Sequence, residues 1–281
     1  MTSPSARGRP RLLASAARIF DLSLGQMLWS RRSVFLAVLV GGPVLMAAMV
    51  RVAATLELAA LPRINGARIG GPALFGVMIW LLYIRFIVPV LGVFYGTALI
   101  ADEIEDRTIT YLFTRPIPRS SVLLGKYLSY LACTLLLVLP SVVLVYFLVV
   151  PLGGAGIGSE FPSLLADLGM LAVGLASYGA VFALVGARLK RPLVIGLMFA
   201  FGWEPGVLLF PGYLKRATVA FYLQALVPHA IPQDSAVSVL MQLFQETPPV
   251  TTSLLSLTCI TLVTLWLAAR AVETREYVLE Q

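Results

Sequence analysis

Six long apolar runs constrain this chain more than any other feature, because each is close to the length that crosses a lipid bilayer. They lie at about 34–54, 73–100, 127–150, 164–187, 193–210 and 252–269. Because 59% of the residues are hydrophobic and only 12% are charged, no segment has the composition of a soluble domain. We therefore predict an all-α integral membrane protein, with one transmembrane domain over residues 1–281 and six transmembrane helices.

The segment before the first run has a different pattern. Between residues 11 and 32, apolar side chains recur at steps of three and four, with polar residues between them. This spacing predicts an amphipathic helix that lies in the membrane interface. A helix that packs on a partner protein would show the same spacing, so that alternative stays open.

The basic residues set the orientation. Fifteen of the 21 lysines and arginines fall in the N-terminus, in 101–126, in the connection after the fourth run and in the tail, which all lie on one side. Basic residues favour the cytoplasmic side, so we predict that both termini and the 101–126 stretch are cytoplasmic. On the opposite side, residues 211–251 carry apolar side chains at helical spacing and are predicted to form short helices in an outer loop.

The sequence lacks the motifs that are typical of several classes of function. There is no G-x-x-x-x-G-K-[ST] phosphate loop, and the basic residues sit at the ends of apolar runs, so no nucleic-acid partner is predicted. Cys133 and Cys259 lie inside apolar runs and His229 is the single histidine, so we predict no metal site and no bound cofactor. If the protein performs energised work, the nucleotide chemistry must reside on another polypeptide.

The most polar stretch between two apolar runs is 101–126, which reads ADEIEDRTITYLFTRPIPRSSVLLGK. It holds four acidic and four basic residues around a short apolar centre. Acidic residues contribute little to membrane topology, so their clustering is not explained by orientation alone. We predict that this stretch is a docking surface for a soluble partner. Within it, Gly125 allows a neighbouring helix to approach closely.

The motifs of this stretch resemble the permease subunits of type-2 ABC exporters. The family pattern runs acid-x-acid-x-Gly-Thr, then Pro-[Ile/Val]-x-Arg, then Leu-Leu-Gly-Lys at the start of a span. It stands here as Glu103-x-Glu105-x-Arg107-Thr108, Pro116–Arg119 and Leu123–Lys126. Within this family, the motifs resemble the class associated with multicopper-enzyme maturation and with sodium or drug efflux. One departure is Arg107, which occupies the position of the family's glycine.

The resemblance implies a permease in a bacterial-type plasma membrane, in which 101–126 is a coupling segment seated on an ATP-binding subunit. The polar docking contacts would come from Glu103, Glu105, Arg107, Thr108 and Arg119. It also implies a complex of two ATP-binding subunits with two permeases, either a homodimer or a heterodimer. ATP and magnesium would then be bound by the partner subunit, and this chain would not be an enzyme.

Two charges lie inside the predicted spans. Arg85 is about 24 Å along the second span from its cytoplasmic end, and Glu204 is about 18 Å along the fifth. Ionisable residues at such depths are costly and mark functional sites by default. We expect that they form a pair or that each faces a water-filled pathway.

Two other functions remain open from the residues alone. A membrane scaffold or sensor would use 101–126 to bind a signalling partner. An intramembrane enzyme would need convergent groups, for which the candidates are Arg85, Glu204 and Asp167. An adjacent reading frame with a phosphate loop would favour the exporter.

Overall fold

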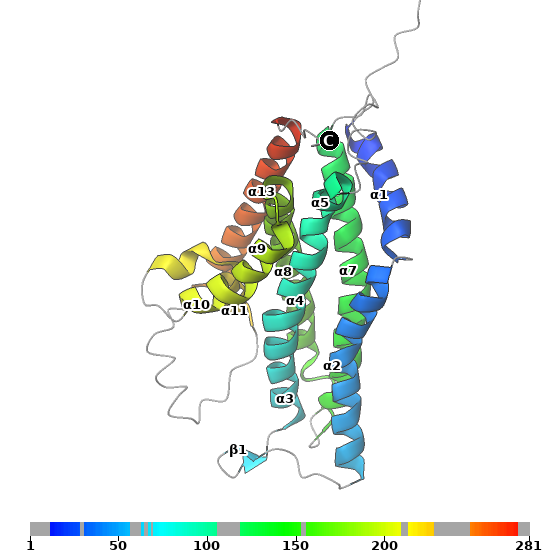
Figure 1. The fold of residues 1–281 in the computed structure, drawn as a ribbon. Helices are drawn as coiled ribbons and strands as arrows, with labels where there is room; N and C mark the ends of the chain where they lie inside the picture. The colour runs from blue at the N-terminus through cyan, green and yellow to red at the C-terminus, as the bar shows by residue number, and fades with distance from the viewer. Residues whose placement is uncertain are drawn as a thin grey trace, which may run out of the picture.

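The structure is a computed structural model that describes residues 12–28, 31–56, 63–64, 67–68, 70–105, 119–152, 156–208, 213–227 and 248–274. These residues are almost all helical (Figure 1). The long helices are α1 (Leu12–Leu28), α2 (Arg31–Thr55), α7 (Arg119–Val149), α8 (Phe161–Arg188) and α13 (Val250–Thr274). The strands β1 (Arg63–Ile64) and β2 (Ala67–Arg68) pair antiparallel in a small hairpin.

Two further helices alternate between α and π geometry. The first runs through α3 (Gly71–Met78), η1 (Ile79–Ile87), α4 (Val88–Leu91), η2 (Gly92–Gly96) and α5 (Thr97–Glu105). The second runs through α9 (Pro192–Leu197), η3 (Met198–Trp203) and α10 (Glu204–Leu208). It is followed by the 3₁₀ helix η4 (Tyr213–Ala217) and by α11 (Val219–Gln224).

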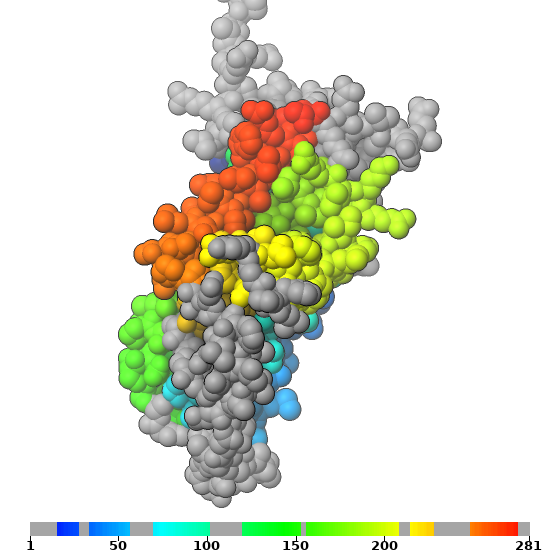
Figure 2. All heavy atoms as spheres, turned by 90° about the vertical axis from the view of Figure 1, so that its left-hand side faces the viewer, coloured from blue at the N-terminus to red at the C-terminus, as the bar shows by residue number. Residues whose placement is uncertain are grey.

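The prediction of a helical membrane protein is confirmed. Five of the described helices are long and apolar enough to cross a membrane, and a shorter apolar helix covers Pro192–Val207. The count of six crossings and the side on which the termini lie stay predictions. Figure 1 shows the ends of α5 and α13 together at one end of the bundle, with the β1 hairpin at the other. Figure 2 shows α13 running obliquely beside the α9–α11 region.

α1 packs against the N-terminal half of α7. A side-chain Cβ at Gly125 would lie 2.7 Å from the carbonyl oxygen of Ala16, so only glycine permits this approach. The hydroxyl of Ser129 donates to the Phe20 carbonyl at 2.9 Å. The close approach predicted at Gly125 is therefore made by α1. The placement of α1 in the membrane interface stays a prediction. Leu22 on α1 is 70% exposed and could contact lipid there.

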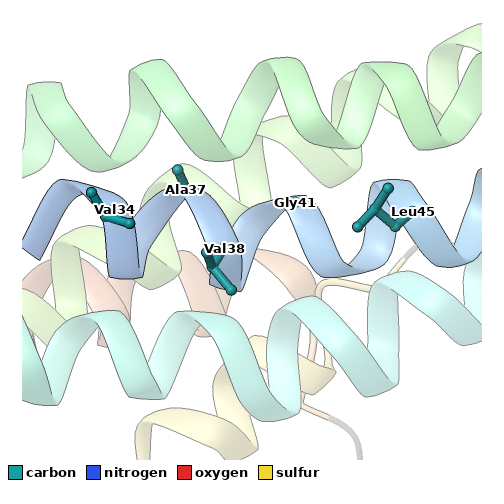
Figure 3. Close-up of a pocket in the computed structure, with 5 residues that line it drawn as sticks. All are labelled: Val34, Ala37, Val38, Gly41 and Leu45. Carbon is teal, nitrogen blue, oxygen red and sulfur yellow. The ribbon is translucent and has the colours of Figure 1, made fainter.

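The exposed side of α2 is apolar. A shallow groove of about 480 Å³ lies along it, lined by Val34, Ala37, Val38, Gly41 and Leu45 (Figure 3). No lining residue carries a polar side chain, so the groove offers nothing to orient a polar ligand. In a membrane protein, a surface of this kind suits contact with lipid acyl chains.

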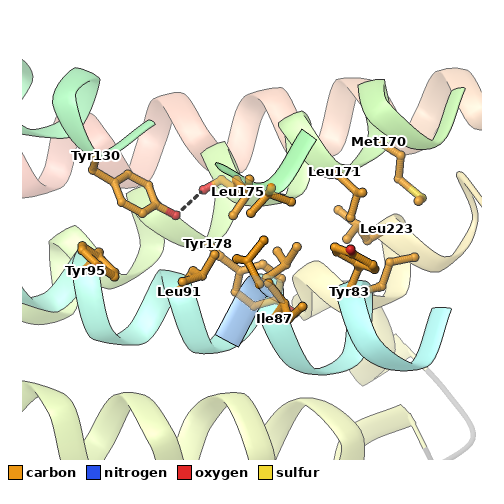
Figure 4. Close-up of a cluster of buried hydrophobic side chains, with 14 of the residues drawn as sticks. Tyr83, Ile87, Leu91, Tyr95, Tyr130, Met170, Leu171, Leu175, Tyr178 and Leu223 are labelled. Carbon is orange, nitrogen blue, oxygen red and sulfur yellow. Dashed lines mark hydrogen bonds between the residues drawn. The ribbon is translucent and has the colours of Figure 1, made fainter. Parts of the chain in front are cut away.

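α8 is the centre of the core. Tyr130 and Tyr127 on α7 donate their hydroxyls to the Leu175 and Ala176 carbonyls of α8, at 3.0 and 2.9 Å (Figure 4 shows the first of these bonds). The hydroxyls of Tyr83 and Ser141 are 3.0 Å apart. Buried tyrosines need such partners, because a phenol without one is costly in an apolar interior. Several tyrosines of this bundle therefore pack inside it.

Glycines on α8 admit its neighbours. A Cβ at Gly186 would lie 2.3 Å from the Thr97 carbonyl oxygen of α5, and one at Gly179 would lie 2.2 Å from the Tyr130 ring. Small residues let helices approach in this way within membranes. Gly179 and Gly186 therefore bring α8 into close contact with α7 and α5.

We predict that Gly186→Ala destabilises the protein by about 1–3 kcal/mol, because the added methyl meets backbone that cannot move aside. Gly169→Ala on the same helix is the matched control, since a Cβ there has no atom within 4 Å. Thermal unfolding of both purified variants measures the difference. Equal unfolding temperatures would contradict the packing described for Gly186.

Candidate functional site

The described residues include both ends of the predicted coupling segment. α5 ends at Glu105 and α7 begins at Arg119. Residues 106–118, which include Arg107 and Thr108, lie outside the described residues, as do the side chains of Glu103, Glu105 and Arg119. The docking role of these five residues therefore stays a prediction.

The two helices that carry this segment are firmly packed. Leu99 and Ile100 on α5 and Val122 and Leu123 on α7 are all buried. The Thr97 carbonyl of α5 also rests on Gly186 of α8. The ends of α5 and α7 on either side of the segment are therefore packed into the bundle, and α5 is in close contact with α8.

A second polar site lies inside the bundle, around Glu204. This residue is the first of α10 and is only 2% exposed. Its Oε2 accepts a hydrogen bond from the hydroxyl of Tyr178 on α8, and its Oε1 accepts one from the backbone N–H of Val219 at 3.1 Å. Glu204 therefore joins α8, α10 and the first turn of α11.

Arg85 lies in the same region, on η1. Its guanidinium carbon is 5.2 Å from the centre of the Trp80 ring, a cation–π contact. Arg85 and Glu204 are near enough to interact through their charges. However, the carboxylate accepts hydrogen bonds from the Tyr178 hydroxyl and from backbone N–H groups at the start of α11. Whether the two charges act as a functional pair stays a prediction.

Arg85 lies within the π-helical stretch η1, and Glu204 directly follows the π-helical stretch η3. Each stretch is followed by a proline. The Val88 N–H bonds to the Tyr83 carbonyl at the end of η1, and the Glu204 N–H bonds to the Phe199 carbonyl at the end of η3, five residues back in each case. Pro89 and Pro205 follow, and each lacks the N–H that an α-helix needs at that point. Wide turns of this kind occur frequently at functional sites.

Sequence reasoning missed two members of the Glu204 site. Tyr178 sits among the small residues of the fourth run, where it was the one large polar side chain; that contrast was the available signal. The contribution of α11 is a backbone N–H, so no side-chain pattern could have indicated it. Asp167, the third candidate for a group of an intramembrane enzyme, is fully buried on α8.

Comparison with protein families identifies the chain. A family model described as ABC-2 family transporter protein matches residues 16–277. The chain belongs to the ABC-2 transporter family. A comparison with curated proteins gave no significant match.

Membership agrees with the bundle described above. ABC-2 proteins are the permease type of membrane component, so this chain is a multi-pass membrane protein that belongs to a transport family. The resemblance drawn from the motifs of 101–126 is thereby confirmed at the level of the family. The Glu204 site and the coupling segment lie within the matched residues of this ABC-2 protein.

We predict that Glu204→Ala destabilises this ABC-2 protein by about 3 kcal/mol, because it leaves the Tyr178 hydroxyl and the Val219 N–H buried without an acceptor. Glu204→Gln keeps a side-chain oxygen and loses less. Hydrogen exchange of the α11 amides should rise in the alanine variant. Glu273→Ala, at an exposed position of α13, is the control. Unchanged exchange in α11 would show that Glu204 does not hold this helix.

Proposed function

We propose that this chain is the membrane-spanning permease subunit of an ATP-driven ABC exporter, in which a separate subunit hydrolyses ATP. The observation that carries the proposal is the family match over residues 16–277. The sequence supports a division of labour, because it contains no phosphate loop of its own. Two permeases, identical or related, would pair with two ATP-binding subunits that hold ATP and magnesium.

The topology that we propose has six crossings and cytoplasmic termini. The α9–α10 helix covers Pro192–Leu208, which gives about 25 Å of helical rise, somewhat less than the hydrocarbon core. It would be the fifth crossing. Figure 1 draws α10 and α11 partway along the bundle and not at its end, which agrees with a short crossing followed by helices that dip inward.

In this proposal the ATP-binding subunit docks on residues 101–126. Glu103, Glu105, Arg107, Thr108 and Arg119 would supply the polar contacts. Closure of the two ATP-binding subunits would push on the segment, and the tight packing of α5 and α7 would carry the movement into the bundle. The contact of Thr97 with Gly186 supports transmission to α8.

The surface around Arg85 is the part that we propose for the transport route. Arg85 is only partly buried, although it lies in the middle of an apolar helix. Around it, Leu81, Phe86 and Phe201 are 51%, 48% and 42% exposed. The rings of Phe86 and Phe201 are 6.2 Å apart, so η1 and η3 share this face. A charge facing lipid is costly, which favours a water-filled route between two permeases.

Replacing the docking residues tests the partner. We predict that Glu103→Ala, Glu105→Ala, Arg107→Ala and Arg119→Ala together reduce co-purification of the ATP-binding subunit roughly tenfold or more, because several charged contacts are lost at once. Co-purified ATPase activity from native membranes is the measurement. The control is Arg51→Ala with Arg216→Ala, which lie on the predicted outer side. Undiminished ATPase recovery in the fourfold variant would sink the docking assignment.

Arg85 tests the route. We predict that Arg85→Ala keeps partner binding and basal ATPase activity, but reduces by about tenfold or more the stimulation by a compound that a screen on the wild-type complex has identified. Arg51→Ala is again the control. Equal stimulation of wild type and Arg85→Ala would remove Arg85 from the route. If the charges act as a pair, the double variant Arg85→Gln/Glu204→Gln, which keeps an oxygen acceptor for Tyr178 and Val219, loses no more stimulation than either single variant.

A further inference from the structure

A groove lies between the ends of α8 and α13, at the end of the bundle where α5 also ends. Its volume is about 560 Å³, and its lining residues are Arg188, Leu189, Leu267, Arg270, Ala271 and Thr274. Figure 2 shows the red end of α13 beside the yellow-green atoms of the α8–α9 region. Among the described residues that line it, none belongs to the Glu204 site.

The groove is strongly basic. Arg188 and Arg270 come from different helices, and both are exposed. Lys190 and Arg191 are exposed on the connection that follows α8. Glu273 is exposed next to Thr274 but is not a lining residue. Attraction to the last carbonyls of a helix accounts for an arginine at each helix end, but not for an open groove between them.

Apart from Thr274, the rest of the groove lining is apolar, and exposed apolar side chains lie farther along α13. Leu189, Leu267 and Ala271 form its walls. Arg270 also contacts Trp266, whose ring centre is 4.9 Å from the guanidinium carbon and which is 56% exposed. Exposed tryptophans are enriched at the level of lipid headgroups. Beyond Trp266, Leu262 and Leu255 are 63% and 73% exposed on the same helix.

We propose that this groove binds the headgroup of an anionic phospholipid. Its phosphate would lie between Arg188 and Arg270, because planar guanidinium groups suit phosphate oxygens. Its acyl chains would follow the exposed leucines of α13. The Thr274 hydroxyl donates to the Arg270 carbonyl at 2.8 Å, which orders the last turn of α13 beneath the headgroup. The site requires a membrane-embedded chain but not an ATP-binding subunit.

The test uses the purified full chain in detergent, titrated with phosphatidylglycerol and followed by native mass spectrometry. We expect retained phosphatidylglycerol on the wild type, with much less phosphatidylcholine. Arg188→Gln with Arg270→Gln should weaken phosphatidylglycerol binding about 30-fold, which corresponds to about fivefold for each basic residue at an anionic surface. The single variant Arg270→Gln should lose about fivefold and serves if the double variant is not monodisperse.

Lys190→Gln with Arg191→Gln is the matched control, because it removes the same charge next to the groove without changing its lining. Wild-type binding in this control supports the proposal. An equal loss in both double variants would reduce the effect to general attraction and overturn it. Unchanged binding in the Arg188/Arg270 variant would overturn it as well. Displacement of the lipid by millimolar inorganic phosphate would identify a site for free anions instead.

Discussion

The absence of water from the membrane interior governs this structure, because every polar group there needs a partner within the protein. Hydroxyl groups inside the apolar helices therefore bond to their own helix, as Thr97 does with the Val93 carbonyl and Thr264 with the Ile260 carbonyl. Tyrosines on α7 reach across to carbonyls of α8. Glu204 is the extreme case, since a carboxyl group takes donors from two other helices. Polar contacts of this kind specify which helices are neighbours, a task that apolar packing in lipid performs poorly.

The second determinant is the presence of glycine at contact positions on α8 and α7. Gly179 and Gly186 bring α7 and α5 against α8, and Gly125 brings α1 against α7. At Gly186 and Gly125 the neighbouring helix approaches with its backbone, and at Gly179 it approaches with the Tyr130 ring. A transporter that works through rigid-body movement needs such contacts, because loose packing would absorb the displacement.

Much of the architecture could be predicted from the sequence. The apolar runs located the long helices, because bilayer thickness gives a length criterion that few other folds share. Gly125 could be predicted as a contact position because its small size is also what allows α1 to approach α7. The π-helical turns were not predicted, since hydropathy does not distinguish 3.6 residues per turn from a wider turn. The partners of Glu204 were missed because one is a backbone group and the other lies on a helix that is distant in the sequence. The docking residues were predicted from motifs alone. The structure describes only the helices α5 and α7 on either side of them, so it does not test this prediction.

Three π-helical stretches, η1, η2 and η3, lie in the two helices that carry Arg85 and Glu204. A π turn holds an additional residue, so moving it along the helix turns the residues that it passes by about 100° and shifts them by about 1.5 Å. A helix can thereby reorient one side chain while both of its ends stay packed. For the α3–α5 helix, one end adjoins the β1 hairpin, the other leads into the coupling segment, and Arg85 lies between them. A shift of its wide turns would rotate part of this helix about the helix axis, whereas an α-helix without them would move as one rigid body.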